Sequence, residues 1–300
     1  MNLWALGPGE STLNYRQSLE EIKNRNLETI FFQSVFPWGY KFYNIVPTFW
    51  TWSDPNAALE GLEFLKNLDS TNPDYEKFQK MLIIIPHFLA DTYQTFRRFS
   101  GTSALKGQKW PQYLNLINEI KRKKFNIWII DANTVKNDAL SSFKSQPAPD
   151  YCDLGFESRF SESCDLIFGT AAFDSETVIG MKYKWGLENK VSSSIFPIAQ
   201  FLGTKELYVM GFDFVGKRFY DYGIDSASWG KKTGQHGYVA GRHAANSKPQ
   251  LEVALGYVKK WIDTTKIHGM KIYSTIEDKY TLINSVVPYK SFADILKEGK

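Results

Sequence analysis

The sequence predicts an α/β fold, a Rossmann-like, doubly wound sheet whose strands are mainly parallel. Segments with the pattern of strands alternate along the chain with segments that have the pattern of helices. The continuous apolar run at residues 81–85 is typical of a strand buried on both faces, and residues 125–131 are expected to form another buried strand. The third observation is the first strand, which runs directly into a glycine turn and a helix start within residues 3–11.

The first third of the chain is expected to hold a strand at 3–6, a helix at 10–26, strands at 28–33 and 48–52, and a helix at 56–68. Apolar residues recur among charged ones in the first helix, and Ser11 or Thr12 can cap its start. Pro37, Gly39 and Pro47 predict a loop before the strand at 48–52.

The following helix begins with a clear signal, because Pro55 suits a first helical position and Ser53 or Asp54 can cap it. The remaining elements are expected as strands at 81–85, 125–131, 206–211 and 271–274 and helices at 113–124, 193–202 and 251–264. Gly203 stops the helix at 193–202. Residues 137–163 are polar and carry two prolines, which predicts loops.

Residues 215–248 are glycine-rich, basic and aromatic, and they show no clear period. An irregular segment of this length inside a compact domain is usually functional, often as a lid over an active site. The chain has 300 residues and 43% hydrophobic content, enough to bury a large core. We therefore expect one domain spanning residues 1–300, with a candidate lid at 215–248.

The composition limits the class of protein. A net charge of +4 fits a protein that handles anionic small molecules and does not by itself indicate a nucleic-acid binder. The chain has no apolar run of about 18 residues and no signal-peptide pattern, so we expect a soluble, cytoplasmic protein without a transmembrane segment. Cys152 and Cys164 lack a CxxC spacing and the four histidines are scattered, so no metal site is expected.

Polar or small residues follow three of the expected strands. Gly7 and Gly9 flank Pro8, and their lack of side chains lets backbone N–H groups approach a phosphate at the start of a helix. Asp54 and Asp213 follow two other strands, and the carboxyl ends of parallel strands meet at one edge of the sheet. Each residue also has a simpler interpretation: a tight turn, a helix cap for Asp54, or a strand end for Asp213.

The candidate lid carries histidines and basic residues. A histidine on a glycine-hinged loop suits a general base, because its unperturbed pKa is about 6.5. We favour His243 for this role and leave His236 undecided. Arg242 and its basic neighbours are suited to clamp a phosphate, and solvated surface charge is the alternative account.

The order of these motifs resembles the bacterial sialyltransferases that elaborate lipooligosaccharide, and the related DUF115-type proteins. Residues 6–11 are similar to the G-x-G-P-S-like turn that opens both families, and residues 198–214 to a helix followed by "LGxKEIYLxGxDF". Residues 48–55 and 254–260 add to the similarity. The resemblance implies a metal-independent, inverting glycosyltransferase with a CMP- or UDP-linked sugar donor, a Rossmann-like core and a lid.

The resemblance also implies site residues. His243 is the nearest match to the family's catalytic histidine, whereas strict spacing places Asn246 there. Tyr220 and Tyr222 fall in the region of the phosphate-binding tyrosines, although Val215 replaces one of them. The expected site comprises His243 as the catalytic residue and, for the donor, Gly7, Pro8, Gly9, Ser11, Asp54, Ser192, Ser193, Asp213, Tyr220, Tyr222 and Arg242.

Several alternatives stay open at this point. The acceptor is expected to be a soluble glycan or another hydroxyl compound, because the tail at 292–300 is short and mixed in charge. DNA with hydroxymethylated bases is an alternative acceptor, since the candidate lid is basic and aromatic. A DUF115-like diphosphokinase would instead need Mg²⁺ held by Asp54 and Asp213. A nucleotide-sugar binding protein without turnover is the non-enzymatic alternative.

Overall fold

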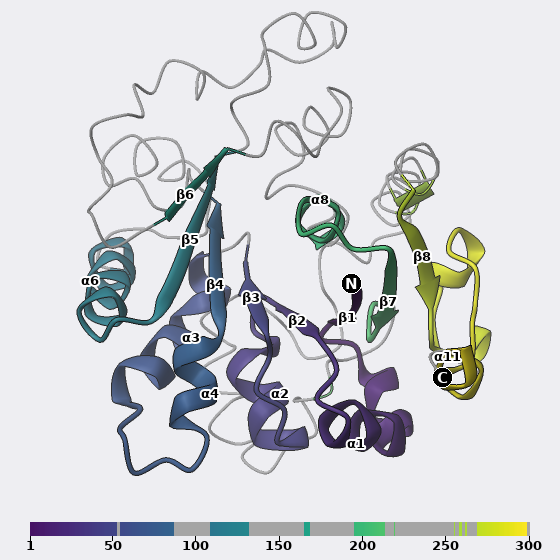
Figure 1. The fold of residues 1–300 in the computed structure, drawn as a ribbon, viewed down its shortest axis with the longest axis horizontal. Helices are drawn as coiled ribbons and strands as arrows, with labels where there is room; N and C mark the ends of the chain where they lie inside the picture. The colour runs from purple at the N-terminus through teal and green to yellow at the C-terminus, as the bar shows by residue number, and fades with distance from the viewer. Residues whose placement is uncertain are drawn as a thin grey trace, which may run out of the picture. The chain divides into compact units, whose positions relative to one another are not determined.

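Parallel strand pairing organises the protein in the computed structural model (Figure 1). The structure describes residues 1–52, 55–86, 109–131, 165–168, 195–213 and 269–298, together with Phe219, Leu255, Val258, Lys259 and Ile262. The chain forms two compact units. The first joins Met1–Ile45 to Ile198–Lys300, and the second is Val46–Pro197.

The first unit contains four neighbouring parallel strands, in the order β2 (Thr29–Phe32), β1 (Asn2–Leu6), β7 (Glu206–Met210) and β8 (Lys271–Ser274). In register, Leu6 lies opposite Phe31 on one side and Met210 on the other. The chain winds from β1 to β2 in one direction and from β7 to β8 in the other. The predicted doubly wound, parallel α/β fold is therefore confirmed.

The helices of this unit depart from the sequence predictions near the N-terminus. The expected helix at 10–26 is a 3-10 helix, η1 (Glu10–Tyr15), followed by α1 (Arg16–Asn24), which buries Leu19 and Ile22. Beyond it, α8 (Ile195–Phe201) covers the opposite face of the sheet from α1 (Figure 1). The predicted stop is confirmed, because Gly203 has a φ of +72°.

The prediction of a loop around Pro37 and Gly39 is wrong, because these residues form α2 (Val35–Tyr43). Val35 and Phe36 are fully buried, and this packing outweighs the local preference for a loop. Phe36 has non-helical backbone angles, so Pro37 stands where a helical turn starts and its missing N–H is not needed.

The C-terminal part of the unit holds two short 3-10 helices and one α-helix that the sequence did not predict: η9 (Asp278–Tyr280), η10 (Ile283–Ser285) and α11 (Phe292–Glu298). Three aromatic side chains at one register position form a row across the sheet. Trp4 contacts Tyr208, which stacks on Tyr273. Phe292 packs on Trp4, with ring centroids 5.0 Å apart, and so fixes α11 against this row.

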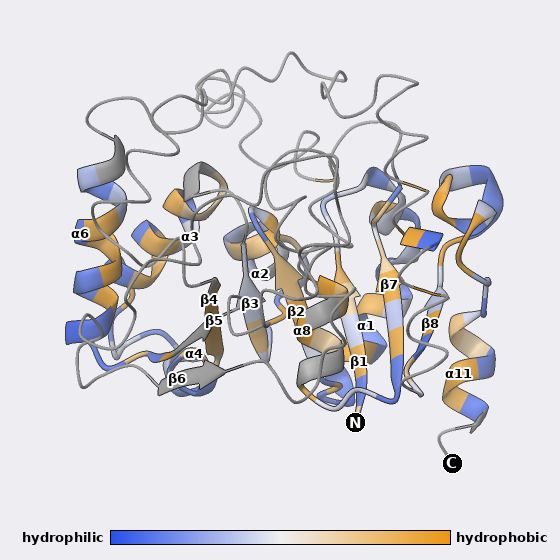
Figure 2. Ribbon diagram, turned by 90° about the horizontal axis from the view of Figure 1, so that it is seen from above, coloured by the Kyte–Doolittle hydropathy of each residue, from blue (hydrophilic) through white to orange (hydrophobic). Residues whose placement is uncertain are grey.

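The second unit contains the parallel strands β3 (Phe49–Thr51), β4 (Leu82–Pro86), β5 (Asn126–Asp131) and β6 (Asp165–Phe168). Among its described residues lie the helices α3 (Pro55–Asn67), α4 (Tyr75–Lys80) and α6 (Lys109–Arg122), of which α4 was not predicted. Apolar and polar positions alternate along α6, as a helix with one buried face requires (Figure 2). In the core, the indole N–H of Trp52 donates to the Tyr113 hydroxyl over 3.0 Å.

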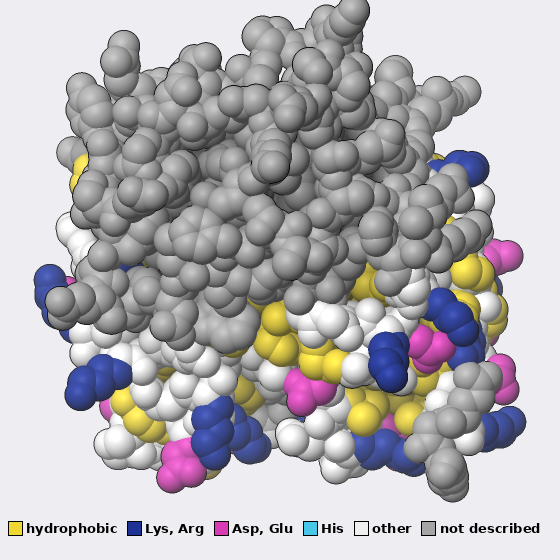
Figure 3. Space-filling view, turned by 45° about the horizontal axis from the view of Figure 1, so that its top comes forward, with side chains coloured by type: hydrophobic (Ala, Val, Ile, Leu, Met, Phe, Trp, Pro, Cys, Tyr) yellow, Lys and Arg dark blue, Asp and Glu magenta, His cyan; other side chains and the backbone are white. Residues whose placement is uncertain are grey.

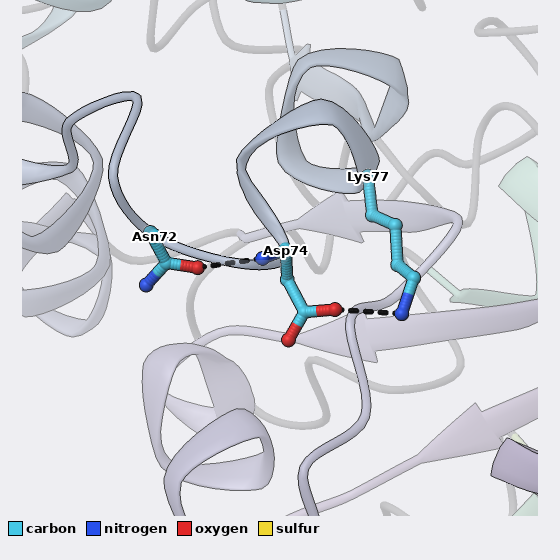
Figure 4. Close-up of polar contacts among 3 residues, drawn as sticks. All are labelled: Asn72, Asp74 and Lys77. Atoms are coloured by element: carbon cyan, nitrogen blue, oxygen red, sulfur yellow. Dashed lines mark hydrogen bonds and ion pairs between the residues drawn. The ribbon is translucent and has the colours of Figure 1, made fainter.

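Side-chain contacts before α4 explain where that helix begins. The backbone N–H of Asp74 donates to the Asn72 side chain over 2.9 Å, and Lys77 pairs with the Asp74 carboxylate at 2.6 Å (Figure 4). The carboxylate stands at the start of the helix, where negative charge is favoured. These contacts depend on three polar residues within six positions, a signal too short to distinguish a helix start from a loop.

Several predicted segments fall wholly or partly outside the described residues, namely the loops at 137–163, the candidate lid at 215–248 and the helix at 251–264. In the last of these, Leu255, Val258, Lys259 and Ile262 are described and helical, with Val258 and Ile262 buried. Among the described residues, no helix is long and apolar enough to cross a membrane.

Candidate functional site

Two turns meet where β1 and β7 end. The backbone N–H of Gly7 donates to the Met210 carbonyl over 2.8 Å, and that of Gly9 to the Gly211 carbonyl over 2.7 Å. The pairing of the two strands thus continues beyond their ends. This is also the point where the winding of the sheet changes direction, the position at which open α/β sheets bind ligands.

Close backbone approach explains the glycines of both turns. A Cβ on Gly9 would collide with the carboxyl group of Asp213, and a Cβ on Gly7 with the Gly211 carbonyl. Gly211 itself has a φ of +75°, and a Cβ there would lie 2.7 Å from the Gly7 oxygen. The N–H groups of Gly7 and Gly9 are bonded within the protein, so any ligand at this edge meets other groups of the turns.

Ser11 and Asp213 form a buried pair that joins the two turns. The Ser11 backbone N–H donates to Asp213 Oδ2 over 2.9 Å, and its hydroxyl donates to Oδ1 over 2.5 Å. The prediction that Ser11 or Thr12 caps the helix is therefore wrong. Gly9 occupies the cap position without a side-chain bond, and the Thr12 hydroxyl donates to the Gly9 carbonyl.

The Asp213 side chain is almost fully buried, with 2% of its surface exposed. Burial raises the pKa of this carboxyl to about 7, although the two hydrogen bonds from Ser11 lower it, and the nearby charge of Glu10 raises it further. The backbone carbonyl oxygen of Asp213 accepts a 3.0 Å hydrogen bond from the backbone N–H of Leu282. Asp213 therefore carries a partial charge near neutral pH and is held from both its side chain and its backbone.

A second set of contacts holds the first turn from the side. The Thr12 hydroxyl lies 3.0 Å from the Gly9 carbonyl and 2.9 Å from the hydroxyl of Tyr43, the last residue of α2. The backbone N–H of Phe219 donates to the Pro8 carbonyl over 2.9 Å, and its ring packs on Tyr43. Phe219, which follows β7 in the sequence, therefore lies against the turn after β1.

The structure brings together five of the predicted site residues: Gly7, Pro8, Gly9, Ser11 and Asp213. The others lie outside the described residues and stay predictions: Asp54, Ser192, Ser193, Tyr220, Tyr222, Arg242 and His243, with the alternatives His236 and Asn246. Sequence reasoning gave Thr12 another role, that of a helix cap, and missed Gly211, Tyr43 and Phe219. Of these only Gly211 had a signal, since it separates an apolar strand from Asp213; Tyr43 lay in an expected loop.

No family model and no curated protein matches the chain. A crystal structure of a variant of the sialyltransferase CST-II in complex with CMP is similar at 13% identity and a TM-score of 0.44, covering 98% of this chain and 88% of that one. At that TM-score the likeness carries no argument about function. Within the described ranges, no cluster of three or more His, Cys, Asp or Glu residues could hold a metal ion.

Proposed function

We propose that the protein is an inverting, metal-independent glycosyltransferase that moves a sugar from a CMP- or UDP-linked donor to an acceptor hydroxyl, as sialyltransferases do. The observation that carries the proposal is the pair of glycine turns joined by Ser11 and Asp213 where the winding of the sheet reverses. Ligands of open α/β sheets bind at such a point. The sequence resemblance of residues 6–11 and 198–214 supplies the class of reaction.

In the proposed reaction the acceptor oxygen attacks the anomeric carbon, and the bond from that carbon to the phosphate oxygen breaks. His243 takes the proton from the acceptor hydroxyl, because a general base strengthens the nucleophile as the bond forms. Negative charge builds on the leaving phosphate, where Tyr220, Tyr222 and Arg242 donate hydrogen bonds. Asp54, Ser192 and Ser193 complete the proposed donor contacts.

The electrostatics of Asp213 are compatible with an anionic ligand at this edge. An ionised carboxylate beside a phosphate would repel it, whereas the raised pKa keeps Asp213 partly protonated near neutral pH. Ser11 supports both protonation states, because its hydroxyl can donate to a carboxylate or accept from a carboxylic acid. The contact between Ser11 and Asp213 thus keeps its geometry when an anionic ligand binds at this edge.

The test is a thermal-shift screen of CMP-, UDP-, GDP- and ADP-linked sugars, followed by a transfer assay with the donor that stabilises most. A ligand at a concentration of 100 times its Kd stabilises the fold by about 2.7 kcal/mol, a clear shift in melting temperature. We expect one donor class to shift it, and the shift to survive EDTA. His243→Ala should keep this shift and lose transfer by a factor of roughly 100 or more.

His236→Ala and Asn246→Ala are the matched variants for the position of the base, because both lie near His243 in the sequence. If either abolishes transfer while His243→Ala does not, the base belongs to that residue. A shift that disappears in EDTA favours the diphosphokinase. Full affinity for a donor without turnover on any acceptor favours the binding protein. Absence of any shift across the donors rules against the proposal.

A further inference from the structure

Tyr43 connects α2 to both segments that frame the candidate site. It is the last residue of α2, and 8% of its surface is exposed. Its hydroxyl contacts Thr12 in η1, and its ring contacts Phe219 beyond β7 at a centroid distance of 5.2 Å. No residue next to Tyr43 in the sequence carries a motif, so the contact is visible only in the fold.

The direction of the hydrogen bonds follows from counting protons. The Thr12 hydroxyl has a single proton, which it donates to the Gly9 carbonyl. In the contact between the two hydroxyls Tyr43 is therefore the donor and Thr12 the acceptor. Burial raises the pKa of Tyr43 to about 12, so the phenol keeps its proton at any pH at which the fold is studied.

This chain of bonds holds the turn at one residue, Gly9. The Gly9 carbonyl is held by Thr12, and the N–H of the same residue is held by Gly211. Hydrogen bonds in a buried chain polarise and strengthen one another, so loss of the Tyr43 donor weakens the bond from Thr12 to Gly9 as well. The turn after β1 therefore depends on a hydroxyl that does not touch it.

The ring of Tyr43 makes a separate contact, with the ring of Phe219. Phe219 is fully buried, and its ring meets Phe42 edge to face at 5.4 Å as well as Tyr43. These ring contacts hold Phe219 where its backbone N–H donates a hydrogen bond to the Pro8 carbonyl. The hydroxyl and the ring of Tyr43 thus fix two different points of the same turn, and a substitution of Tyr43 by Phe removes only the first.

We propose that Tyr43 is a positioning residue of the nucleotide-sugar site: its hydroxyl, acting through Thr12, fixes the Gly9 carbonyl and thereby the turn that receives the donor. The inference rests on the function proposed above. Tyr43 does not contact the donor, so its loss weakens donor binding and leaves the chemical step in place. Such a loss raises KM for the donor and leaves kcat unchanged.

The experiment compares Tyr43→Phe with Tyr113→Phe. Both substitutions remove one buried, hydrogen-bonded phenol, but the Tyr113 hydroxyl accepts from Trp52 in the second unit. We expect Tyr43→Phe to raise KM for the donor roughly tenfold, the effect of one lost buried hydrogen bond. Amide exchange of Gly9 and Ser11 should accelerate by a similar factor, whereas that of Trp4, within β1, stays unchanged. Tyr113→Phe should alter neither quantity.

Thr12→Val removes the hydrogen bond between Thr12 and Tyr43 from the Thr12 side, and it replaces Tyr43→Phe in the experiment if that variant does not fold. The double variant should lose no more than the larger single loss, because the two hydroxyls act in series. If a donor binds the wild type and Tyr43→Phe changes neither KM nor the exchange of Gly9 and Ser11, the role of Tyr43 is overturned. If no donor binds the wild type, the proposed function fails, and exchange alone decides whether Tyr43 holds the turn.

Discussion

Asp213 shows how one buried carboxyl links the fold to pH. In the native state burial raises its pKa to about 7, and only the neutral groups of Ser11 donate to its side chain among the described residues. In the unfolded chain the pKa returns to about 4. The native state therefore binds more protons than the unfolded state between these values, and the stability that this proton contributes is lost as pH rises.

Asp213→Asn tests this account because asparagine keeps the shape and has no charge at any pH. Its amide oxygen can accept from the Ser11 N–H and its NH₂ can donate to the Ser11 hydroxyl. We expect the wild type to lose unfolding free energy relative to the variant between about pH 4 and pH 7, on the order of 4 kcal/mol at most. Urea unfolding of both proteins at pH 5 and pH 8 covers about two of these three pH units, a relative loss of about 3 kcal/mol. Parallel pH dependences of the two proteins would contradict the account.

At the scale of elements, periodic patterns could be predicted and contacts distant in sequence could not. The strand at 271–274 has the predicted bounds, and the bounds of the strands expected at 81–85 and 125–131 agree with the structure to within one residue. The helix α2 was missed because Pro37 and Gly39 are weighed locally, whereas burial of Val35 and Phe36 decides the structure. The same limit hid Tyr43, whose partner Thr12 lies 31 residues away.

The candidate site shows the same division. Gly7, Gly9 and Asp213 could be predicted because each lies within three residues of the end of a strand, and parallel strands end at a common edge. What the glycines contact could not be predicted. Their close approach is to Gly211 and Asp213, and that depends on the register between β1 and β7.

Gly203 and Gly211 have nearly equal φ angles, so the two positions allow the cost of the left-handed conformation to be compared with the cost of crowding. Gly203 follows α8 with a φ of +72°, and no atom lies within 4 Å of the point that a Cβ would occupy. Gly211 follows β7 with a φ of +75° and is crowded by Gly7 and Thr12. Gly203→Ala should cost about 1 kcal/mol of unfolding free energy, from the left-handed conformation alone. Gly211→Ala should cost about 3 kcal/mol or more, because backbone must also move.

Chemical denaturation of both variants at one pH gives the comparison. Equal losses for Gly203→Ala and Gly211→Ala would show that the two turns have room for a methyl group, and the close contact between them would then be wrong. A larger loss for Gly211→Ala, with the slope against denaturant unchanged, supports the contact.

At the scale of the whole molecule, the candidate turns belong to a unit assembled from both ends of the chain. Met1–Ile45 supplies β1, β2 and α2, and Ile198–Lys300 supplies β7, β8 and Asp213. Pairing of β1 with β7 therefore closes about 200 residues of chain before Ser11 can meet Asp213. The contacts of Gly9 and Ser11 with Gly211 and Asp213 depend on that long-range pairing, which is why local sequence patterns do not predict them.

The distribution of charge over the whole molecule bears on the acceptor. The chain has a net charge of +4, and on the described part of the face in Figure 3 the Lys and Arg side chains are interspersed with Asp and Glu. Binding to a DNA backbone needs clustered cations that neutralise several phosphates at once. The basic residues of the candidate lid lie outside the described residues, and a small glycan or another hydroxyl compound stays the expected acceptor.

Fluorescence anisotropy with duplex DNA at 50 mM and 200 mM salt tests this expectation. The affinity should stay in the non-specific range, with a Kd of about 1 μM or weaker at the higher salt, and the donor that stabilises the fold should not tighten it. A protein that contacts 6–10 phosphates would instead lose roughly a thousandfold or more in affinity between the two salt concentrations. DNA would be the acceptor if the protein binds it tightly at low salt, loses affinity that steeply at high salt, and binds it more tightly when the donor is present.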